Sequence, residues 1–403
     1  MIDIVGGVYL ERCHWPPRRA LYGSGGRAAA AISQLVKPIR LHTYIGDRER
    51  EALRSIASSY GFFVQTSEIP QTIAFDYFHG LSVPTITPAH RKPTRPLNVT
   101  GNFVLRFGFI EGDAVVNGET VVYDPQNVLH PTLFTANGSR ADRLAVILNR
   151  GEGALLSQKK NPHDIVKAVA DAESAEVVVL KLGPLGAMVW ERGKVTTVPC
   201  FKTDYVWPIG SGDVFAAVFF SYWAKMRRRA VEAAHRASYA AALYCNSEVL
   251  PISRKQLQTK AFQPVVAKSR RETLSRGVVY LAGPFFTIAQ RWLVEEVRSA
   301  LLGMGLRVFS PLHDVGHGAA SDVAIKDIKG LEKSTAVFAI VDGLDSGTLF
   351  EVGYARAKGI PVVALVQNES ADAVKMIEGS GCVMEGDLVS AIYKTVWAVL
   401  RGL

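Results

Sequence analysis

The sequence predicts an α/β protein built from two parallel-sheet domains and a basic connector. Over residues 1–250, short apolar runs ending in Gly, Asp or Asn alternate with longer helical patterns, as in a parallel sheet covered by helices. Residues 251–276 break this alternation with seven Lys or Arg and a single Glu, which is typical of a solvated linker. A second alternation starts at Gly277 and continues through residues 277–403. A chain of 403 residues is long enough for two such domains.

In the first domain, the apolar runs place strands and helices in sequence order. We expect buried strands at residues 2–7, 39–46, 119–124, 131–137 and 175–183. We expect helices at residues 28–36, 139–150 and 212–226.

In the second domain, strands and helices alternate more regularly, and several helical patterns close at glycine. Strands are expected at residues 277–283, 306–311, 335–342 and 360–366, and helices at residues 287–305, 323–334 and 348–359. This pattern predicts a small doubly wound domain. Because ligands of such sheets bind at the carboxyl ends of the strands, residues 282–286, 310–314 and 342–347 should line one crevice.

Composition excludes several classes of function. The net charge of +9 leans mildly toward anionic partners, but the connector has little aromatic interleaving, so we do not expect nucleic-acid binding. The four cysteines are far apart and form no CxxC pair, which argues against a zinc site or a disulfide framework and fits a cytoplasmic protein. The N-terminal residues lack the pattern of a signal peptide, and no apolar run is long enough to span a membrane.

Glu351 is a lone carboxylate among apolar neighbours such as Phe350 and Val352. A charged side chain between apolar neighbours is either half-buried at an energetic cost or has a role in chemistry. It falls near the start of the helix that follows the third strand, so the helix dipole should keep it ionised, as a nucleophile requires. Asp345 precedes this helix, where capping and function are equally good explanations for an aspartate.

Three motifs of the second domain resemble the nucleoside 2-deoxyribosyltransferase family. They are Tyr280-Leu-Ala-Gly-Pro-Phe-Phe286, the helix with Asp327, and Asp345-x5-Glu351-x-Gly353-Tyr354-Ala355. The likeness covers nearly all of residues 277–370 and implies a flavodoxin-like or Rossmann-like sheet.

This resemblance implies a role for each matching residue. Glu351 would attack the anomeric carbon of a 2′-deoxynucleoside and form a covalent glycosyl-enzyme, while Asp327 would handle the nucleobase and assist its protonation. Tyr280 would position the glutamate, Asp345 would lie near the 5′ end of the sugar, and Gly283 would contact substrate. The chemistry needs an ionised carboxylate and an acid, and no metal or cofactor. The family also implies a homo-oligomer whose neighbouring subunits complete each site.

The residue at position 345 also predicts which substrate is preferred. Related hydrolases of nucleoside 5′-monophosphates tend to have serine where Asp345 stands. A carboxylate would repel the phosphate, so we expect free nucleosides to be preferred over nucleotides.

A glycine-rich turn, Gly210-Ser211-Gly212-Asp213, precedes an apolar helix in the first domain. Backbone N–H groups of such a turn can bind an anion, and Asp213 could accept a proton from a hydroxyl nucleophile. In context the turn resembles the GAGD hallmark of ribokinase-like (PfkB-type) sugar and nucleoside kinases. The stretches Tyr123-Asp-Pro125 and Val179-Leu-Lys-Leu-Gly-Pro-Leu-Gly186 support this, and the likeness covers most of residues 1–250.

The resemblance implies that Asp213 is the catalytic base and that Gly210, Ser211 and Gly212 form the anion hole. Glu11, Gly25 and Gly26 would face the phosphate acceptor, with ATP and Mg²⁺ as cofactors of an active kinase.

Three positions depart from the kinase pattern. The family motif Asn-x-x-Glu is read here as Asn137-Gly-Ser-Arg140, an alanine run occupies residues 28–31 where the family often has Asn, and Trp207-Pro208 replaces Asp-Thr. An active kinase and a degenerate ligand-binding domain therefore remain equal alternatives.

Together, the two resemblances predict an enzyme that cleaves or exchanges the N-glycosidic bond of a (deoxy)nucleoside, fused to a kinase-fold domain. Its partners would be a nucleoside and a free base, with ATP and a sugar if the first domain is active. The alternative is a regulatory protein in which the kinase-fold domain binds a nucleotide or sugar and controls an N-glycosidase effector.

Overall fold

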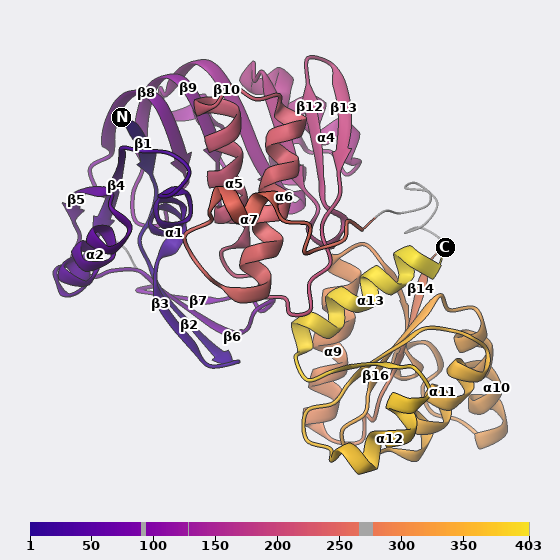
Figure 1. Cartoon of the computed structure of the whole chain (residues 1–403). Coiled ribbons are helices and arrows are strands. Elements are labelled where there is room, and N and C mark those ends of the chain that lie inside the picture. Colours follow the sequence, from indigo (N-terminus) through magenta and orange to yellow (C-terminus); the bar gives the residue numbers. More distant parts are fainter. Residues whose placement is uncertain (90–93, 128, 266–276, 403) are drawn as a thin grey trace. The chain divides into compact units, whose positions relative to one another are not determined.

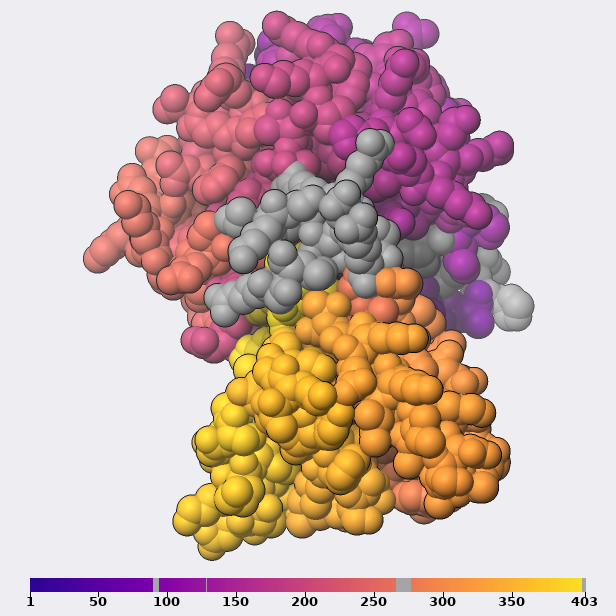
Figure 2. All heavy atoms as spheres, turned by 90° about the vertical axis from the view of Figure 1, so that its right-hand side faces the viewer, coloured from indigo at the N-terminus to yellow at the C-terminus, as the bar shows by residue number. Residues whose placement is uncertain are grey.

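The computed structural model describes residues 1–89, 94–127, 129–265 and 277–402. The chain divides into two compact units. Unit 1 comprises Met1–Thr203 and Trp207–Pro264, and unit 2 comprises Asp204–Val206 and Val265–Leu403. Figure 2 shows the described side chains of each unit packed closely on the visible face.

Within the described residues, unit 1 is built on a large twisted sheet of nine strands (Figure 1). In spatial order they are β13 (Lys194–Val198), β12 (Ala187–Glu191), β11 (Val177–Lys181), β10 (Arg140–Asn149), β9 (Ala114–Asp124), β8 (Leu97–Phe107), β1 (Ile2–Val5), β4 (Ile39–Ile45) and β5 (Phe63–Glu68). Neighbours from β11 to β5 pair in parallel, and β12 and β13 continue the sheet antiparallel. Every residue of β1 is buried, as expected where helices cover both faces of a parallel sheet.

The helices of unit 1 cover this sheet, with α5 and α6 side by side and α1 next to α5 (Figure 1). They are α1 (Gly23–Ile32), α2 (Asp47–Tyr60), α3 (Arg150–Ser157), α4 (Pro162–Glu173), α5 (Ser211–Phe220), α6 (Ala230–Ser247) and α7 (Arg254–Gln258), with short 3₁₀ or π turns η1 (Phe134–Asn137), η2 (Gly183–Leu185) and η3 (Ser221–Lys225). A smaller sheet has the order β3 (Arg18–Leu21), β2 (Leu10–Trp15), β6 (Ala74–His79) and β7 (Thr85–Thr87).

Two sequence-based predictions in unit 1 are wrong. Residues 139–150 form strand β10 rather than a helix, because the run from Leu144 to Leu148 is buried on both faces between β9 and β11. This burial overrides the helix propensity of the Ala, Arg and Leu residues in the segment. Residues 131–137 contain the 3₁₀ turn η1 rather than a strand.

The first part of the connector has structure of its own. Helix α7 lies in residues 251–265 and starts with a capping box, in which Ser253 and Gln256 satisfy each other's backbone N–H groups. Its Leu257 is buried in unit 1. The remainder of the predicted connector, residues 266–276, lies outside the described residues.

Unit 2 contains a five-stranded sheet, counted over its described residues, in which all neighbours pair in parallel. The spatial order is β15 (Arg307–Phe309), β14 (Val278–Ala282), β16 (Ala336–Ile340), β17 (Val362–Leu365) and β18 (Val383–Glu385). The connecting segments are α9 (Ile288–Gly303), the π turn η4 (Pro311–Val315), α10 (Ala320–Glu332), α11 (Ser346–Ala357), α12 (Ala371–Gly379) and α13 (Leu388–Gly402).

The strand order of unit 2 indicates where a ligand would bind. Helices α9 and α13 lie together, and α10 lies beside α11, so that the sheet is doubly wound (Figure 1). The chain reverses direction across the sheet between β14 and β16, and in such folds ligands bind at that switch point. The predicted α/β class and the small doubly wound second domain are thus confirmed. No helix among the described residues is both long and apolar enough to cross a membrane.

Candidate functional site

In unit 2, the switch point brings together Tyr280 of β14 and Glu351 of α11. The Tyr280 hydroxyl donates a hydrogen bond to Glu351 Oε1 at 2.5 Å. Tyr280 is fully buried, and its ring stacks on Phe309 of the neighbouring strand with centroids 5.4 Å apart. The hydroxyl is therefore held in one place by the core, and it fixes the orientation of the glutamate.

Glu351 is less acidic than its place near a helix start predicted. Burial raises the pKa of Glu351 to about 7, with further contributions from the charges of Asp327 and Asp345, while the Tyr280 hydrogen bond acts in the opposite direction. Glu351 is the sixth residue of α11, beyond the first turn in which the helix dipole acts strongly. That the helix dipole keeps Glu351 ionised stays a prediction, and desolvation acts against it.

Asp327 of α10 lies near this pair, since its charge acts on both Glu351 and Tyr280. Burial raises the pKa of Asp327. Its Oδ1 atom is buried and finds no hydrogen-bond partner among the described residues. A carboxyl that resists ionisation and has an unused oxygen is suited to exchange a proton with a bound group.

Asp345 and Gly283 both have clear structural roles at the same crevice. Asp345 is the N-cap of α11, and its Oδ2 accepts from the Thr348 backbone N–H at 2.8 Å and from the Thr348 hydroxyl at 2.9 Å. A Cβ atom at Gly283 would lie 3.0 Å from the Cβ of Ile340, so close packing of the two strand ends favours glycine. The proposed substrate contacts of both residues remain predictions.

In unit 1, the predicted acceptor residue Glu11 and the predicted base Asp213 share a buried arginine that the sequence did not single out. Arg27 of α1 is 2% exposed. Its guanidinium makes an ion pair with Glu11 and donates to Asp213 Oδ2 at 2.8 Å and to the Tyr244 hydroxyl at 3.1 Å. The alanine run that follows Arg27 packs in the core, while the Arg27 guanidinium reaches the predicted site.

Both oxygens of Asp213 are engaged. Oδ2 is paired with Arg27, and Oδ1 accepts from the side-chain amide of Gln126 at 2.5 Å. Gln126 adopts a left-handed backbone conformation with φ of 46°, which costs on the order of 1 kcal/mol for a residue with a side chain. Asp213 is therefore held in place by two donors, one on each carboxylate oxygen.

The glycines of the predicted phosphate and acceptor sites differ in how strongly their surroundings require a residue without a side chain. Gly210 is the N-cap of α5 at φ of 83°, and a Cβ there would lie 2.2 Å from Arg27 Nε. Gly25 packs against the backbone of Gly6, where a Cβ would lie 2.5 Å from the carbonyl oxygen. A Cβ atom at Gly26 would lie 3.4 Å from a methyl group of Val8, which is an ordinary van der Waals contact. The Ser211 N–H donates to the Pro208 carbonyl at 3.1 Å.

The pattern Asn-x-x-Glu occurs in unit 1 at a position other than Asn137–Arg140. Arg140 begins β10, so residues 137–140 lie at the amino end of that strand. At the carboxyl end of β10 stands Asn149-Arg-Gly-Glu152, where Asn149 and Glu152 form a capping box for α3. The helix predicted over residues 139–150 gives no indication of this motif, because the motif is positioned by the end of a strand. The departure at Arg140 therefore does not remove an Asn-x-x-Glu pattern from unit 1.

Glu152 belongs to a charged group at the ends of β9, β10 and β11. Lys181, the last residue of β11, donates to Asp124 Oδ2 at 2.6 Å. Asp124 is completely buried, and burial, with a contribution from Glu152, raises its pKa to about 7 although Lys181 acts in the opposite direction. Asp213 also acts electrostatically on Asp124 and Lys181, so this group adjoins the glycine-rich turn.

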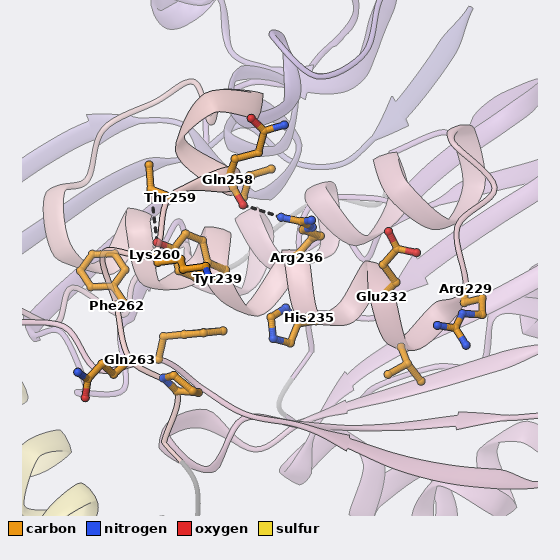
Figure 3. A pocket seen from close by; sticks show the side chains of 14 residues that line it. Arg229, Glu232, His235, Arg236, Tyr239, Gln258, Thr259, Lys260, Phe262 and Gln263 are labelled. Atoms are coloured by element: carbon orange, nitrogen blue, oxygen red, sulfur yellow. Dashed lines mark hydrogen bonds between the residues drawn. The ribbon is translucent and has the colours of Figure 1, made fainter.

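A separate pocket of about 800 Å³ lies between α6, α7 and residues 259–264 of unit 1. Aromatic side chains Phe201, Tyr239 and Phe262 and the basic side chains of Arg229 and Arg236 line it (Figure 3). The guanidinium of Arg236 is already bound to the Leu257 carbonyl at 2.6 Å. The pocket shares no residue with either predicted site.

The geometry defines unit 2 as a doubly wound domain with a buried tyrosine–glutamate pair at its switch point, and unit 1 as an α/β domain with a glycine-rich turn. Residues 279–392 match the model of the nucleoside 2-deoxyribosyltransferase family, and residues 138–250 match the model of the pfkB family of carbohydrate kinases. The chain therefore contains one segment similar to each family, which confirms the two resemblances seen in the sequence.

Solved structures similar to this chain include several kinases. Ribokinase from Thermotoga maritima is 16% identical over 64% of this chain and 98% of its own, with a TM-score of 0.48. A nucleoside kinase from Methanocaldococcus jannaschii is 14% identical over 64% of this chain and 97% of its own, with a TM-score of 0.47. A pyrophosphate-dependent kinase in the ribokinase family is 13% identical over 64% and 99%, with a TM-score of 0.48. No curated protein matches the chain.

Proposed function

We propose that unit 2 cleaves or transfers the N-glycosidic bond of a nucleoside or 2′-deoxynucleoside through a covalent bond to Glu351. The observation that carries this proposal is the hydrogen bond of 2.5 Å from the buried Tyr280 hydroxyl to Glu351 at the switch point of the sheet. A glutamate buried at a cost and fixed by a core tyrosine is a candidate nucleophile. The family match over residues 279–392 supports the same chemistry.

The proposed reaction has two steps at one carbon. An oxygen of the ionised Glu351 carboxylate forms a bond to the anomeric carbon, the C–N bond breaks, and its electron pair leaves with the base. Asp327, whose pKa is raised by burial, supplies a proton to the departing base through its unpartnered Oδ1. A second base or water then attacks the same carbon and releases Glu351, so that the configuration is retained.

Replacing Tyr280 with phenylalanine should move the pH dependence of this reaction. The nucleophile is the ionised glutamate, so kcat/KM should rise with pH through the pKa of about 7. The Tyr280 hydrogen bond favours the ionised form, and its loss should shift this rise upward by about one pH unit. The measurement is the pH profile of base release.

Tyr354 offers a matched control for this test. Its hydroxyl donates to the exposed Glu332 at 2.6 Å, so Tyr354→Phe removes an equivalent bond on the surface. That variant should keep the wild-type profile. An unshifted profile in Tyr280→Phe would show that the tyrosine does not tune the nucleophile.

The substrate is found by chromatography of the chain incubated with nucleosides, 2′-deoxynucleosides and their 5′-monophosphates, with and without a second free base. Base exchange would identify a transferase, and base release alone a hydrolase. The carboxylate of Asp345 at the start of α11 favours nucleosides over monophosphates. Faster turnover of a 5′-monophosphate would overturn that preference, and no release from any substrate would overturn the proposal.

A second candidate function concerns unit 1. Arg27 and Gln126 both bind the Asp213 carboxylate. This arrangement favours a domain that binds a sugar or nucleotide and regulates unit 2, and it does not favour an active ATP-dependent kinase. Phosphorylation of a sugar or nucleoside with ATP and Mg²⁺, lost in Asp213→Asn, would establish the kinase instead.

We also propose that the chain forms a homo-oligomer through unit 2. Large apolar side chains stand exposed on and before its helices, among them Phe286 at 72%, Ile288 at 89% and Phe350 at 59%. Such side chains are commonly covered in an assembly. Light scattering that gives the mass of a single chain would contradict this.

A further inference from the structure

Phe309, the last residue of β15 in unit 2, contacts both Tyr280 and helix α10. Its ring stacks on the ring of Tyr280, with 18° between the two planes and centroids 5.4 Å apart. The ring carbons farthest from the backbone meet Gly330 of α10, where a Cβ atom would lie 2.7 Å from Cε2 and closer still to two other ring carbons. One ring thus connects the tyrosine that holds Glu351 with the helix that carries Asp327.

The backbone at Phe309 is held by the turn that follows it. The Ser310 N–H donates to Asp314 Oδ2 at 2.8 Å, and Ser310 is 1% exposed. His313 links this turn to α9, since its Nδ1 lies 3.1 Å from Ser310 Oγ and its Nε2 lies 2.7 Å from Glu295 Oε1. The end of β15 is therefore fixed to a neighbouring helix, and the Phe309 ring has little freedom to withdraw.

Helix α10 is held less firmly than the ring that it contacts. Its buried residues are Gly330 and Leu331 in the last turn, while residues 320–326 are mostly exposed. Its N-cap is Ala319, which has no side-chain oxygen to bind the first N–H groups. Asp327 lies three residues before Gly330, so the two are neighbours on the helix surface. Added volume at Gly330 would therefore shift the helix, and Asp327 with it.

The position of Asp327 relative to Glu351 matters for the proposed reaction. The acid must reach the departing base while the glutamate attacks the anomeric carbon of the same nucleoside, and a misplacement of about 1 Å can cost about 100-fold in rate. The charge of Asp327 acts on both Glu351 and Tyr280, which supports their closeness. A rigid contact between α10 and the ring stacked on Tyr280 would hold that geometry constant.

We infer that Phe309 is a positioning residue for the glycosidic chemistry of unit 2, and that its ring, packed against Gly330, sets the distance from Asp327 to Glu351. The inference rests on the proposed function of unit 2. Phe309 acts through its two contacts and exchanges no proton with the substrate. Glycine is needed at position 330 because a side chain there would push α10 away from the ring.

The test is the kcat of base release by the full chain carrying Gly330→Ala, alone and together with Asp327→Asn. Gly330→Ala should lower kcat by about 10- to 100-fold, because the added methyl group displaces the acid. In the Asp327→Asn background no acid remains to be displaced, so the same change should alter kcat by less than about threefold. A larger loss in that background would show general disruption and would overturn the inference.

Phe309→Leu should rescue the defect, because the smaller side chain leaves room for the methyl group added at position 330. The double variant Phe309→Leu/Gly330→Ala should be at least about fivefold more active than Gly330→Ala, whereas independent sites would give the product of the two losses. Additive losses would overturn the inference. Gly303→Ala is the matched control and should keep the wild-type kcat, since Gly303 ends α9 and a Cβ there meets no described atom within 4 Å.

Failure of this inference differs from failure of the proposed function. If the wild-type chain releases base and Glu351→Gln does not, the proposed function stands. A kcat of Gly330→Ala within about threefold of wild type would then show that Phe309 does not position the acid. No base release by the wild-type chain would overturn both.

Discussion

Glu351→Gln is expected to lower base release or exchange from a nucleoside by a factor of about 10³ or more. Glutamine keeps the size and the polar contact to Tyr280 but cannot form the glycosyl ester. The measurement is the rate of base release by chromatography with the best substrate of the wild-type chain. A rate within tenfold of wild type would exclude a covalent role for Glu351.

The same substitution should make the folded protein more stable at high pH. Burial raises the pKa of Glu351 from 4.5 to about 7, so the fold favours the protonated carboxyl. The stability that this group contributes is fully present below about pH 4.5 and is lost as the pH rises through about 7. Glutamine is never charged, so the variant should be more stable than wild type by as much as about 3 kcal/mol at pH 8, and equal to it near pH 4.

Unfolding curves at the two pH values check this expectation and control for misfolding. A variant that is inactive and more stable at pH 8 has lost chemistry and not structure. A variant that is less stable at both pH values would show that the glutamate holds the fold, and its loss of activity would then carry no weight.

Arg27→Met is expected to destabilise unit 1 by about 3–5 kcal/mol. The arginine is 2% exposed and balances both Glu11 and Asp213. Removing it leaves two carboxylates facing each other in a site shielded from water, and the unpaired charges dominate the cost. Urea unfolding of the full chain, followed by tryptophan fluorescence, measures the change.

Arg12 supplies the matched control for Arg27, because it pairs with Asp76 at 2.6 Å while 44% exposed. Arg12→Met should cost less than about 1 kcal/mol. The double variant Arg27→Met/Glu11→Gln should recover part of the loss, since one of the stranded charges is removed. If Arg27→Met costs no more than Arg12→Met, the buried pair does not organise the site.

The sequence predicted the strands and helices of unit 2 well because they are short and are regularly separated by turn residues such as glycine. Short apolar runs such as residues 335–342, bounded by turn residues, are typical of a covered strand. The spacing from Asp345 to Glu351 places one residue at the cap of a helix and the other within that helix. The acidity of Glu351 could not be predicted in the same way. It depends on how deeply the tertiary structure buries the side chain and on Asp327 from another helix.

The site of unit 1 was harder to predict because it depends on contacts between residues that are far apart in the sequence. Arg27 sits before an alanine run, and nothing in that run indicates that the guanidinium meets Glu11 from β2 and Asp213 from α5. Residues 139–150 carry helix-forming side chains, yet they lie in the middle of a large sheet as β10. Local propensity cannot report the burial that decides between these two outcomes.

The cap of α11 has a consequence for how proteins with the proposed activity diversify. Aspartate and serine are about equally good at the first position of a helix, so Asp345 could be exchanged for serine while the helix stays capped. The exchange would remove a negative charge from the crevice at little cost to folding. A lineage could thus drift between neutral and phosphorylated substrates by a single codon change, with selection acting on the ligand alone.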